Sequence, residues 1–287
     1  MSSTEKKKMS KKKKILIIVL CVLLALVAAV VGAGVYALNW YCTDPEFTVT
    51  QTAEEVELIA HRGFRAVAPE NTAPAYEEAG KAGYYGAECD IYRTSDGVWV
   101  LHHDPVTYRM MDGCTNLEKH TYQELLEQTV DNGSNIESYP DLKVCTLEEY
   151  LQICREYGMV PVIELKGKNN TEHYDEVIEI VNQYLDTNPI FISFQLDNLK
   201  KIRALSDLPC WYLVQEITEE EIENALSIGG SCGIDFNYSK EENTDDIIMK
   251  CVNTGMPVGA WTVDDPEAAA RLSNLGVKYI TTDSITK

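Results

Sequence analysis

Short apolar runs alternate with amphipathic segments along the chain from Val56 onward. Eight runs have the length and residue types of buried strands: VELIAHR, GAECDIY, VPVIELK, IFISFQ, CWYLVQ, GIDFNY, PVGAWTV and VKYITTD. The segments between them have helical spacing of apolar residues, and several begin at Thr or Asp and end at Gly, as helices do. Eight strands with intervening helices over roughly 230 residues predict an α/β fold, a (β/α)₈ TIM barrel.

An open, doubly wound sheet is the alternative arrangement of the same elements. Such sheets often carry a Gly-rich phosphate loop after the first strand, and here HRGFRAVAPENT follows it instead. One segment, residues 107–142, breaks the alternation: it contains one predicted helix, from Thr121 to about Gln128, and otherwise turn residues. We interpret it as an insertion over the mouth of the barrel, where loops commonly shape substrate access.

The amino-terminal part has a different pattern. Residues 1–14 are a basic, lysine-rich segment, and residues 15–38 contain no charged residue. That apolar run is long enough to span a bilayer, and the lysines before it predict a cytoplasmic amino terminus. A secretory signal peptide cleaved after Ala37 is the alternative. Residues 39–55 then form a linker and residues 56–287 an extracellular barrel, held at the cell membrane by a single-pass anchor or secreted if the segment is cleaved.

Charge and cysteine usage narrow the possible partners. The net charge is -20 although the first fourteen residues are basic, so the remainder is strongly acidic. Such a surface excludes nonspecific nucleic-acid binding, which needs clustered Lys and Arg. The nine cysteines include no CxxC pair, so zinc has no spacing support. Cysteines in apolar runs are predicted to be buried thiols, and disulfide pairing stays open.

Polar and aromatic residues stand at the ends of the predicted strands, where a barrel places its reactive groups: His61, Arg62, Glu88, Asp90, Glu164, Lys166, Gln195, Trp261 and Asp283. Side chains alternate along a strand, so Glu88 and Asp90 face one side and Cys89 the other. Two facing carboxylates are unfavourable without a positive charge between them. Three carboxylates from adjoining strands, with Glu164 as the third, suit a hard cation such as Mg²⁺ or Ca²⁺.

The blocks AHRGFRAVAPENTAPAY, ECDIYRTSDGVWVLHHD and IELK resemble, in order and spacing, the signatures of the glycerophosphodiester phosphodiesterase family. This family is similar to phosphatidylinositol phospholipases C in its barrel and its histidine pair. The resemblance extends from about Val56 to Asp283. It implies that Glu88, Asp90 and Glu164 hold one divalent cation, Mg²⁺ or Ca²⁺, and that His61 and His103 are the catalytic residues.

The chemistry of phosphodiester cleavage assigns roles to these groups. Arg62 and Lys166, with the metal, can stabilise the negative charge of the phosphorane-like transition state. One histidine accepts a proton from the nucleophile and the other donates one to the leaving alkoxide; we expect His61 to be the base and His103 the acid. The nucleophile is water or a neighbouring glycerol hydroxyl. His102 is predicted to pack away from the site.

Three further residues are candidates for the site or for the structure around it. Asn71 of the PENT block either hydrogen-bonds a catalytic group or ligand, or caps the following helix. Glu70 is assigned to the start of that helix. Trp261 either walls the substrate pocket or belongs to the core. Two departures from the family pattern, Asp264 in place of Asn and the absence of Pro after Thr282-Asp283, affect the expected pocket details and not the reaction.

The favoured function is therefore that of a phosphoric diester hydrolase, a metal-dependent enzyme that cleaves glycerophosphodiesters to an alcohol and sn-glycerol 3-phosphate. Its expected partners are a glycerophosphodiester or lysolipid substrate and the membrane. Lysophospholipase-D or phospholipase-like activity on lipids, activity on glycerophosphate wall polymers, and a noncatalytic exported barrel are the alternatives. The full set of histidines, carboxylates and Lys166 argues against the last, because a degenerate member is expected to have lost some of them.

Overall fold

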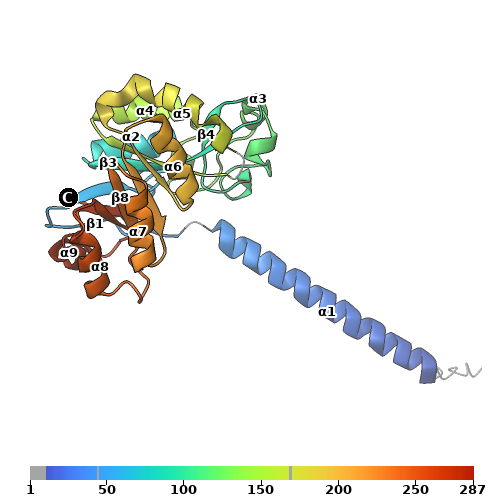
Figure 1. Ribbon diagram of the computed structural model, residues 1–287. Helices are drawn as coiled ribbons and strands as arrows, with labels where there is room; N and C mark the ends of the chain where they lie inside the picture. Colours follow the sequence, from blue (N-terminus) through green and yellow to red (C-terminus); the bar gives the residue numbers. More distant parts are fainter. Residues whose placement is uncertain (1–10, 44, 168–169) are drawn as a thin grey trace, which may run out of the picture. The chain divides into compact units, whose positions relative to one another are not determined.

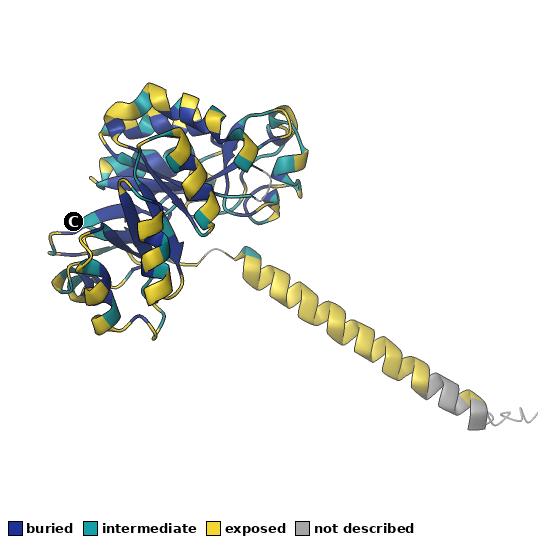
Figure 2. Cartoon of the chain, in the orientation of Figure 1, coloured by how far each residue is buried: buried dark blue, intermediate teal, exposed yellow. Residues whose placement is uncertain are grey.

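The computed structural model describes residues 11–43, 45–167 and 170–287. They divide into two units, Met1–Asp44 and Pro45–Lys287. The first contains a single helix, α1 (Lys11–Cys42), whose stretch Val19–Cys42 has a mean hydropathy of 2.7 and no buried share. Figure 2 shows this stretch exposed except at its last residue, which is intermediate. The helix runs four residues past the predicted boundary at Leu38, because no Gly or Pro interrupts Asn39–Cys42.

Eight parallel strands form a closed ring in the second unit (Figure 1). Each strand pairs with the next along the ring, and β10 returns to pair with β2. The strands are β2 (Glu57–Ala60), β3 (Gly86–Arg93), β5 (Val160–Leu165), β6 (Ile190–Ser193), β7 (Cys210–Val214), β8 (Cys232–Asn237), β9 (Val258–Trp261) and β10 (Tyr279–Thr282). The prediction of a (β/α)₈ barrel is confirmed.

Helices follow most of the strands and cover the outside of the ring: α2 (Ala73–Lys81), α4 (Leu147–Tyr157), α5 (Tyr174–Val181), α6 (Leu196–Leu205), α7 (Glu219–Ser227), α8 (Asp245–Val252) and α9 (Pro266–Asn274). Helix α4 shows why its sequence predicts it well. Thr146 and Glu149 form a reciprocal capping box at its start, and Gly158 ends it at φ 69°, a left-handed conformation that glycine adopts without steric cost.

The core has two layers separated by the strands. The outer layer joins strands to helices and includes Cys89, which lies among side chains of α2 and α4 such as Tyr76 and Cys154. The inner layer fills the barrel, with Ile59, Val162, Ile192, Trp211 and Leu213 among its members. Cys89 therefore points outward, as alternation predicts. Cys145, Cys154, Cys210 and Cys251 are also buried thiols of the outer layer.

A short antiparallel strand and several short helices lie between β3 and α4. Strand β4 (Trp99–Leu101) pairs antiparallel with β3. The insertion contains η1 (Thr107–Arg109), η2 (Leu117–Lys119), α3 (Tyr122–Leu125) and η3 (Ile136–Ser138), packed on its own core of Met110, Met111, Leu117, Leu125 and Val130. Helix α3 begins at the predicted Thr121 cap but is one turn shorter than expected.

Short elements complete the second unit. Two 3₁₀ segments, η4 (Thr171–His173) and η5 (Asn182–Thr187), flank α5. Strand β1 (Thr50–Gln51) pairs in parallel with β11 (Ile285–Thr286). Part of the segment predicted as a linker thus belongs to the folded unit. A strand of only two residues is too short to produce a pattern of alternation in the sequence, so it could not be predicted.

Candidate active site

A cavity of about 320 Å³ opens at the carboxyl ends of the barrel strands. Seven of the nine predicted site residues line it: His61, Arg62, Glu88, His103, Glu164, Lys166 and Trp261. The other two, Asp90 and Asn71, are buried, with 1% and 3% of their surface exposed. We call this space the inner cavity. The fold brings residues from five strands and their following loops to one place.

Three carboxylates converge at the edge of the inner cavity. Glu88, Asp90 and Glu164 each offer an oxygen, and these atoms lie within 4.8 Å of one another. Alternation along β3 places the first two on one face, and the register of β5 sets Glu164 beside Asp90. Burial, followed by the charges of Asp90 and Glu164, raises the pKa of Glu88 well above its ordinary range. Burial also raises the pKa of Glu164, to about 7.

Two basic residues balance part of this negative charge. Lys166 Nζ lies 3.0 Å from Glu164 Oε1 and 3.2 Å from Asp90 Oδ1. Arg62 Nε lies 3.5 Å from Asp90 Oδ2, and the backbone N–H of Arg62 donates to Glu88 Oε2 at 2.8 Å. Although burial raises the pKa of Asp90, the charges of Lys166, His103 and Arg62 hold it well below its ordinary value.

The donor set fits a divalent cation. Asp90 Oδ1 is buried and, apart from its ion pair with Lys166, has no hydrogen-bond partner among the described residues. Glu88 is ionised only at a cost that a cation would relieve. Carboxylate oxygens from adjoining strands are the ligands that Mg²⁺ and Ca²⁺ prefer. Glu88, Asp90 and Glu164 are thus the residues able to hold such an ion, which would add a Lewis acid at the phosphate.

Asn71 lies behind the carboxylates. Its Nδ2 donates to Asp90 Oδ2 at 2.8 Å, and its Oδ1 accepts from the Asp90 backbone N–H at 3.2 Å and from the Tyr76 hydroxyl at 2.9 Å. Thr72, and not Asn71, stands at the cap position of α2. Asn71 thus hydrogen-bonds a carboxylate of the site and does not cap the helix. It does not line the inner cavity.

The two candidate catalytic histidines have different surroundings. His61 Nδ1 lies 2.7 Å from Asp283 Oδ1. Burial and the charge of Arg62 lower the pKa of His61, against the opposing effect of Asp283. His103 is a third exposed, and its Nδ1 lies 3.1 Å from Asp104 Oδ1. His61 is therefore disposed to be neutral, and each imidazole has a carboxylate on its Nδ1 side.

His102 and Asp264 lie next to the site residues and contact the loops that carry them. His102 is buried, and its Nδ1 lies 2.8 Å from the backbone oxygen of Asp104, so it packs away from the inner cavity as expected. Asp264 accepts hydrogen bonds from the Thr282 hydroxyl and the backbone N–H of Asp283, each at 2.8 Å. Asp264, which stands where the family pattern has Asn, therefore fixes the loop that carries Asp283, the partner of His61.

Glu70 has a larger role than its predicted place at the start of a helix. It is 4% exposed, and it lies within ion-pair distance of Arg62, Arg65 and Arg109. Burial raises its pKa, but the three arginines hold that pKa well below the ordinary value. Because Arg109 belongs to the insertion and also binds Asp104, Glu70 couples the insertion to both histidine-bearing loops. The sequence offered no signal for this long-range contact.

Asp235 on β8 is the site residue that sequence reasoning missed most clearly. It lines the inner cavity beside Trp261 and is 3% exposed, and its Oδ1 has no hydrogen-bond partner among the described residues. Burial and the charge of Glu164 raise its pKa to about 8. Its inward direction follows from the alternation in CGIDFN. Trp261 packs edge-on against Phe194, with ring centroids 5.6 Å apart, and walls the same cavity.

Replacing Asp235 with asparagine is expected to stabilise the protein at alkaline pH. The folded state binds this proton more tightly than the unfolded state, whose pKa is near 3.8, so wild-type stability falls between about pH 4 and pH 8, by at most about 1.4 kcal/mol per pH unit. Asn cannot ionise. Thermal unfolding in chelator should show a Tm about 5 °C higher for Asp235→Asn at pH 8 and a smaller difference at pH 5. A pH-independent difference would contradict the assignment.

Comparison with known proteins identifies the family. Residues 61–287 match the family described as glycerophosphoryl diester phosphodiesterase. The human protein named glycerophosphodiester phosphodiesterase 1 is 34% identical over 270 residues, which cover 81% of this chain and 80% of that protein. A putative glycerophosphodiester phosphodiesterase of Bacillus subtilis is 29% identical, covering 79% and 93%.

Solved structures agree with this result. An Oleispira antarctica phosphodiesterase in complex with the product sn-glycerol-3-phosphate superimposes with a TM-score of 0.74 and 26% identity, covering 82% of this chain and 96% of that one. A Parabacteroides distasonis glycerophosphodiester phosphodiesterase gives a TM-score of 0.67 and 28% identity, covering 80% and 93%. The chain therefore belongs to the glycerophosphoryl diester phosphodiesterase family, and it is a phosphoric diester hydrolase.

Proposed function

We propose that this protein hydrolyses glycerophosphodiesters to an alcohol and sn-glycerol 3-phosphate, with one Mg²⁺ or Ca²⁺ on Glu88, Asp90 and Glu164 and with His61 and His103 as the catalytic pair. One observation carries the proposal: the three carboxylates and the two histidines border the same 320 Å³ cavity or lie directly behind it. A related phosphodiesterase is known in complex with sn-glycerol-3-phosphate, which supports the identity of the product.

The residues would divide the work as follows. His61 takes the proton of the attacking water as that oxygen bonds to phosphorus. His103 gives a proton to the alcohol oxygen as its bond to phosphorus breaks. Arg62 and Lys166 border the inner cavity and would stabilise the charge that develops on the phosphoryl oxygens. If a glycerol hydroxyl attacks in place of water, a cyclic phosphate forms first, and its detection in a rapid quench would identify that route.

Asp283 is expected to act as a positioning residue for His61. Asp283→Asn should lower kcat by about 10²-fold, because the imidazole loses the partner that fixes its orientation and tautomer. The carboxylate also raises the pKa of His61, so its removal should move the acidic limb of the kcat/KM profile to lower pH. A loss of kcat with the limb unchanged would indicate a structural role only.

Product analysis tests the proposed reaction. The full chain in detergent micelles would be incubated with several glycerophosphodiesters and Mg²⁺ or Ca²⁺, and released sn-glycerol 3-phosphate would be measured alongside the free alcohol. We expect equal amounts of the two products. Failure on every glycerophosphodiester, with turnover of lysolipids alone, would contradict the proposal and favour a lysophospholipase-D activity.

We also propose the membrane topology expected above: a basic cytoplasmic segment at residues 1–14, a membrane anchor that begins at residue 15, and a barrel outside the cell. The linker between anchor and barrel is shorter than the predicted 39–55, because α1 continues to Cys42 and β1 pairs with β11. The apolar, unburied stretch Val19–Cys42 supports the anchor, although a signal sequence passes the same test. Residues 1–10 lie outside the described residues. Protease added to intact cells should digest the barrel while the cells stay closed; full protection would contradict this topology.

A further inference from the structure

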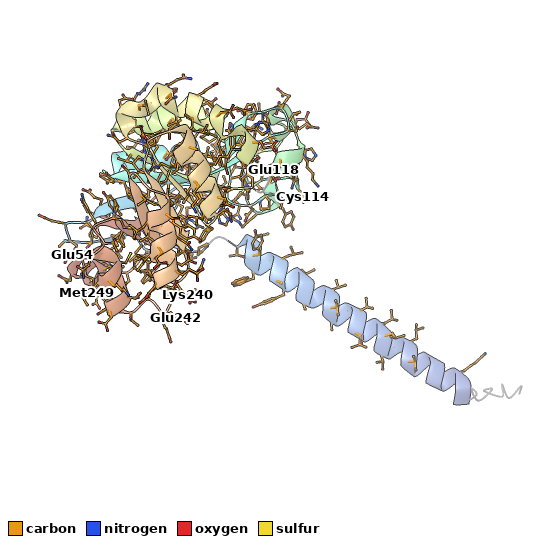
Figure 3. All side chains as sticks on the ribbon, viewed as in Figure 1. Glu54, Cys114, Glu118, Lys240, Glu242 and Met249 are labelled. Carbon is orange, nitrogen blue, oxygen red and sulfur yellow. The ribbon has the colours of Figure 1, made fainter. Side chains whose placement is uncertain are left out.

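The chain between α1 and the first barrel strand is packed against the surroundings of the active site. Helix α1 ends at Cys42, and we call residues 45–52 the strap. Glu54, labelled in Figure 3, follows the strap, and its backbone N–H donates to the Thr52 hydroxyl at 3.3 Å. The strap therefore ends in a hydrogen-bonded turn and belongs to the folded unit.

The first contact of the strap is an aromatic ring on an arginine. Arg65 Cζ lies 5.0 Å from the centroid of the Phe47 ring, a cation–π distance. Arg65 is 8% exposed, and its Nη2 lies 3.0 Å from Glu70 Oε2. Its Nε lies 3.8 Å from Asp283 Oδ1, the same oxygen that His61 Nδ1 contacts at 2.7 Å. Phe47 therefore covers the cation that shares this carboxylate oxygen with His61.

The second contact of the strap is with the backbone directly after Asp283. The N–H of Thr50 donates to the Ser284 oxygen at 3.1 Å, and β1 pairs in parallel with β11 from that point. The Thr286 hydroxyl donates to the Thr50 oxygen at 3.2 Å. Figure 1 shows β1 beside the C-terminus. The strap thus restrains Asp283 twice, at its carboxylate through Arg65 and at its backbone through Ser284.

Such restraint matters because an aspartate carboxylate rotates easily about its last torsion. A carboxylate that orients a catalytic imidazole must keep one oxygen on the ring nitrogen. A cation held near the same oxygen limits the rotation, and an aromatic face over a long arginine side chain limits the freedom of that cation.

We infer that the strap is a positioning element of the active site, in which Phe47 holds Arg65 beside Asp283 and thereby fixes the orientation of His61. The inference rests on the proposed role of His61 as the base. It gives the segment that follows α1 a part in the reaction, although the segment does not line the inner cavity.

The experiment measures kcat and KM of the full chain in detergent micelles, on the glycerophosphodiester that wild type hydrolyses fastest. Phe47→Ala should lower kcat about fivefold with KM unchanged, while Phe47→Tyr, which keeps the ring, should retain wild-type kcat. Tyr184→Ala is the matched control. It breaks a similar stack, with Arg155 Cζ 4.3 Å from the ring centroid, and neither partner lines the inner cavity. Its kcat should be unchanged.

The charge of Arg65 separates positioning from a purely structural role. Burial and the charges of Arg62 and Arg65 lower the pKa of His61, and Asp283 opposes them. Arg65→Gln removes one of these charges, so the acidic limb of its kcat/KM profile should move to higher pH. Arg65→Lys keeps the charge and should leave the limb in place.

Each outcome decides the inference. Wild-type kcat in Phe47→Ala, a loss in Phe47→Tyr as large as in Phe47→Ala, or an unmoved limb in Arg65→Gln overturns the role of the strap while the proposed function stands. If thermal unfolding shows that Phe47→Ala does not stay folded at the assay temperature, the two Arg65 variants decide. A wild type inactive on every glycerophosphodiester overturns the proposed function and this inference with it.

Discussion

Replacing His61 with alanine is expected to lower kcat for glycerophosphodiester hydrolysis by about 10²- to 10⁴-fold. The variant removes the imidazole that would accept the proton of the nucleophile, and it leaves the carboxylates in place. His61 Nδ1 lies 2.7 Å from Asp283 Oδ1, so the variant loses the imidazole that this carboxylate orients. Steady-state release of sn-glycerol 3-phosphate is the measurement.

A matched control keeps this result specific. His173 pairs with Glu176 and does not line the inner cavity, so His173→Ala should retain wild-type kcat. Both variants should bind the divalent ion as wild type does. Normal activity in His61→Ala would refute the assignment of this histidine, whatever the behaviour of the control.

The second large effect concerns the carboxylates. Glu164→Gln is expected to raise the divalent-ion concentration needed for half-maximal activity by about 100-fold or more, because one of three oxygen donors loses its charge. Activity should recover in part at high metal concentration. Titration of activity against Mg²⁺ and against Ca²⁺ measures the shift.

Glu179→Gln provides the comparison, since Glu179 is an exposed residue of α5. Its metal titration should overlay that of wild type. If Glu164→Gln had the wild-type titration and a reduced kcat, Glu164 would act in catalysis without binding metal. If both curves were unchanged, the metal centre would have to lie elsewhere.

The barrel was predictable from the sequence because its signals are local. Each strand is an apolar run, and helix starts such as Thr146 and Thr218 carry their own caps. The positions of His61, Glu88 and Glu164 at the ends of predicted strands likewise predicted that they lie close together, since the carboxyl ends of parallel strands meet at one end of a barrel. The family resemblance singled out His103 over His102, and alternation along the strand separated Asp90 from Cys89.

Long-range contacts were not predictable in the same way. Glu70 meets an arginine of the insertion, and Asp283 meets His61 from the other end of the barrel sequence. Neither pair has a spacing that sequence periodicity can reveal. The pairing of β1 with β11 has the same origin.

The measurement that tests the account most directly is a metal-depletion experiment on the full chain. Glycerophosphodiester turnover would be followed before chelation, after chelation and removal of the chelator, and after addition of Mg²⁺ or Ca²⁺. The three converging carboxylates predict that turnover is lost on depletion and returns with at least one of the two ions. Full turnover in the metal-depleted protein would contradict the central claim.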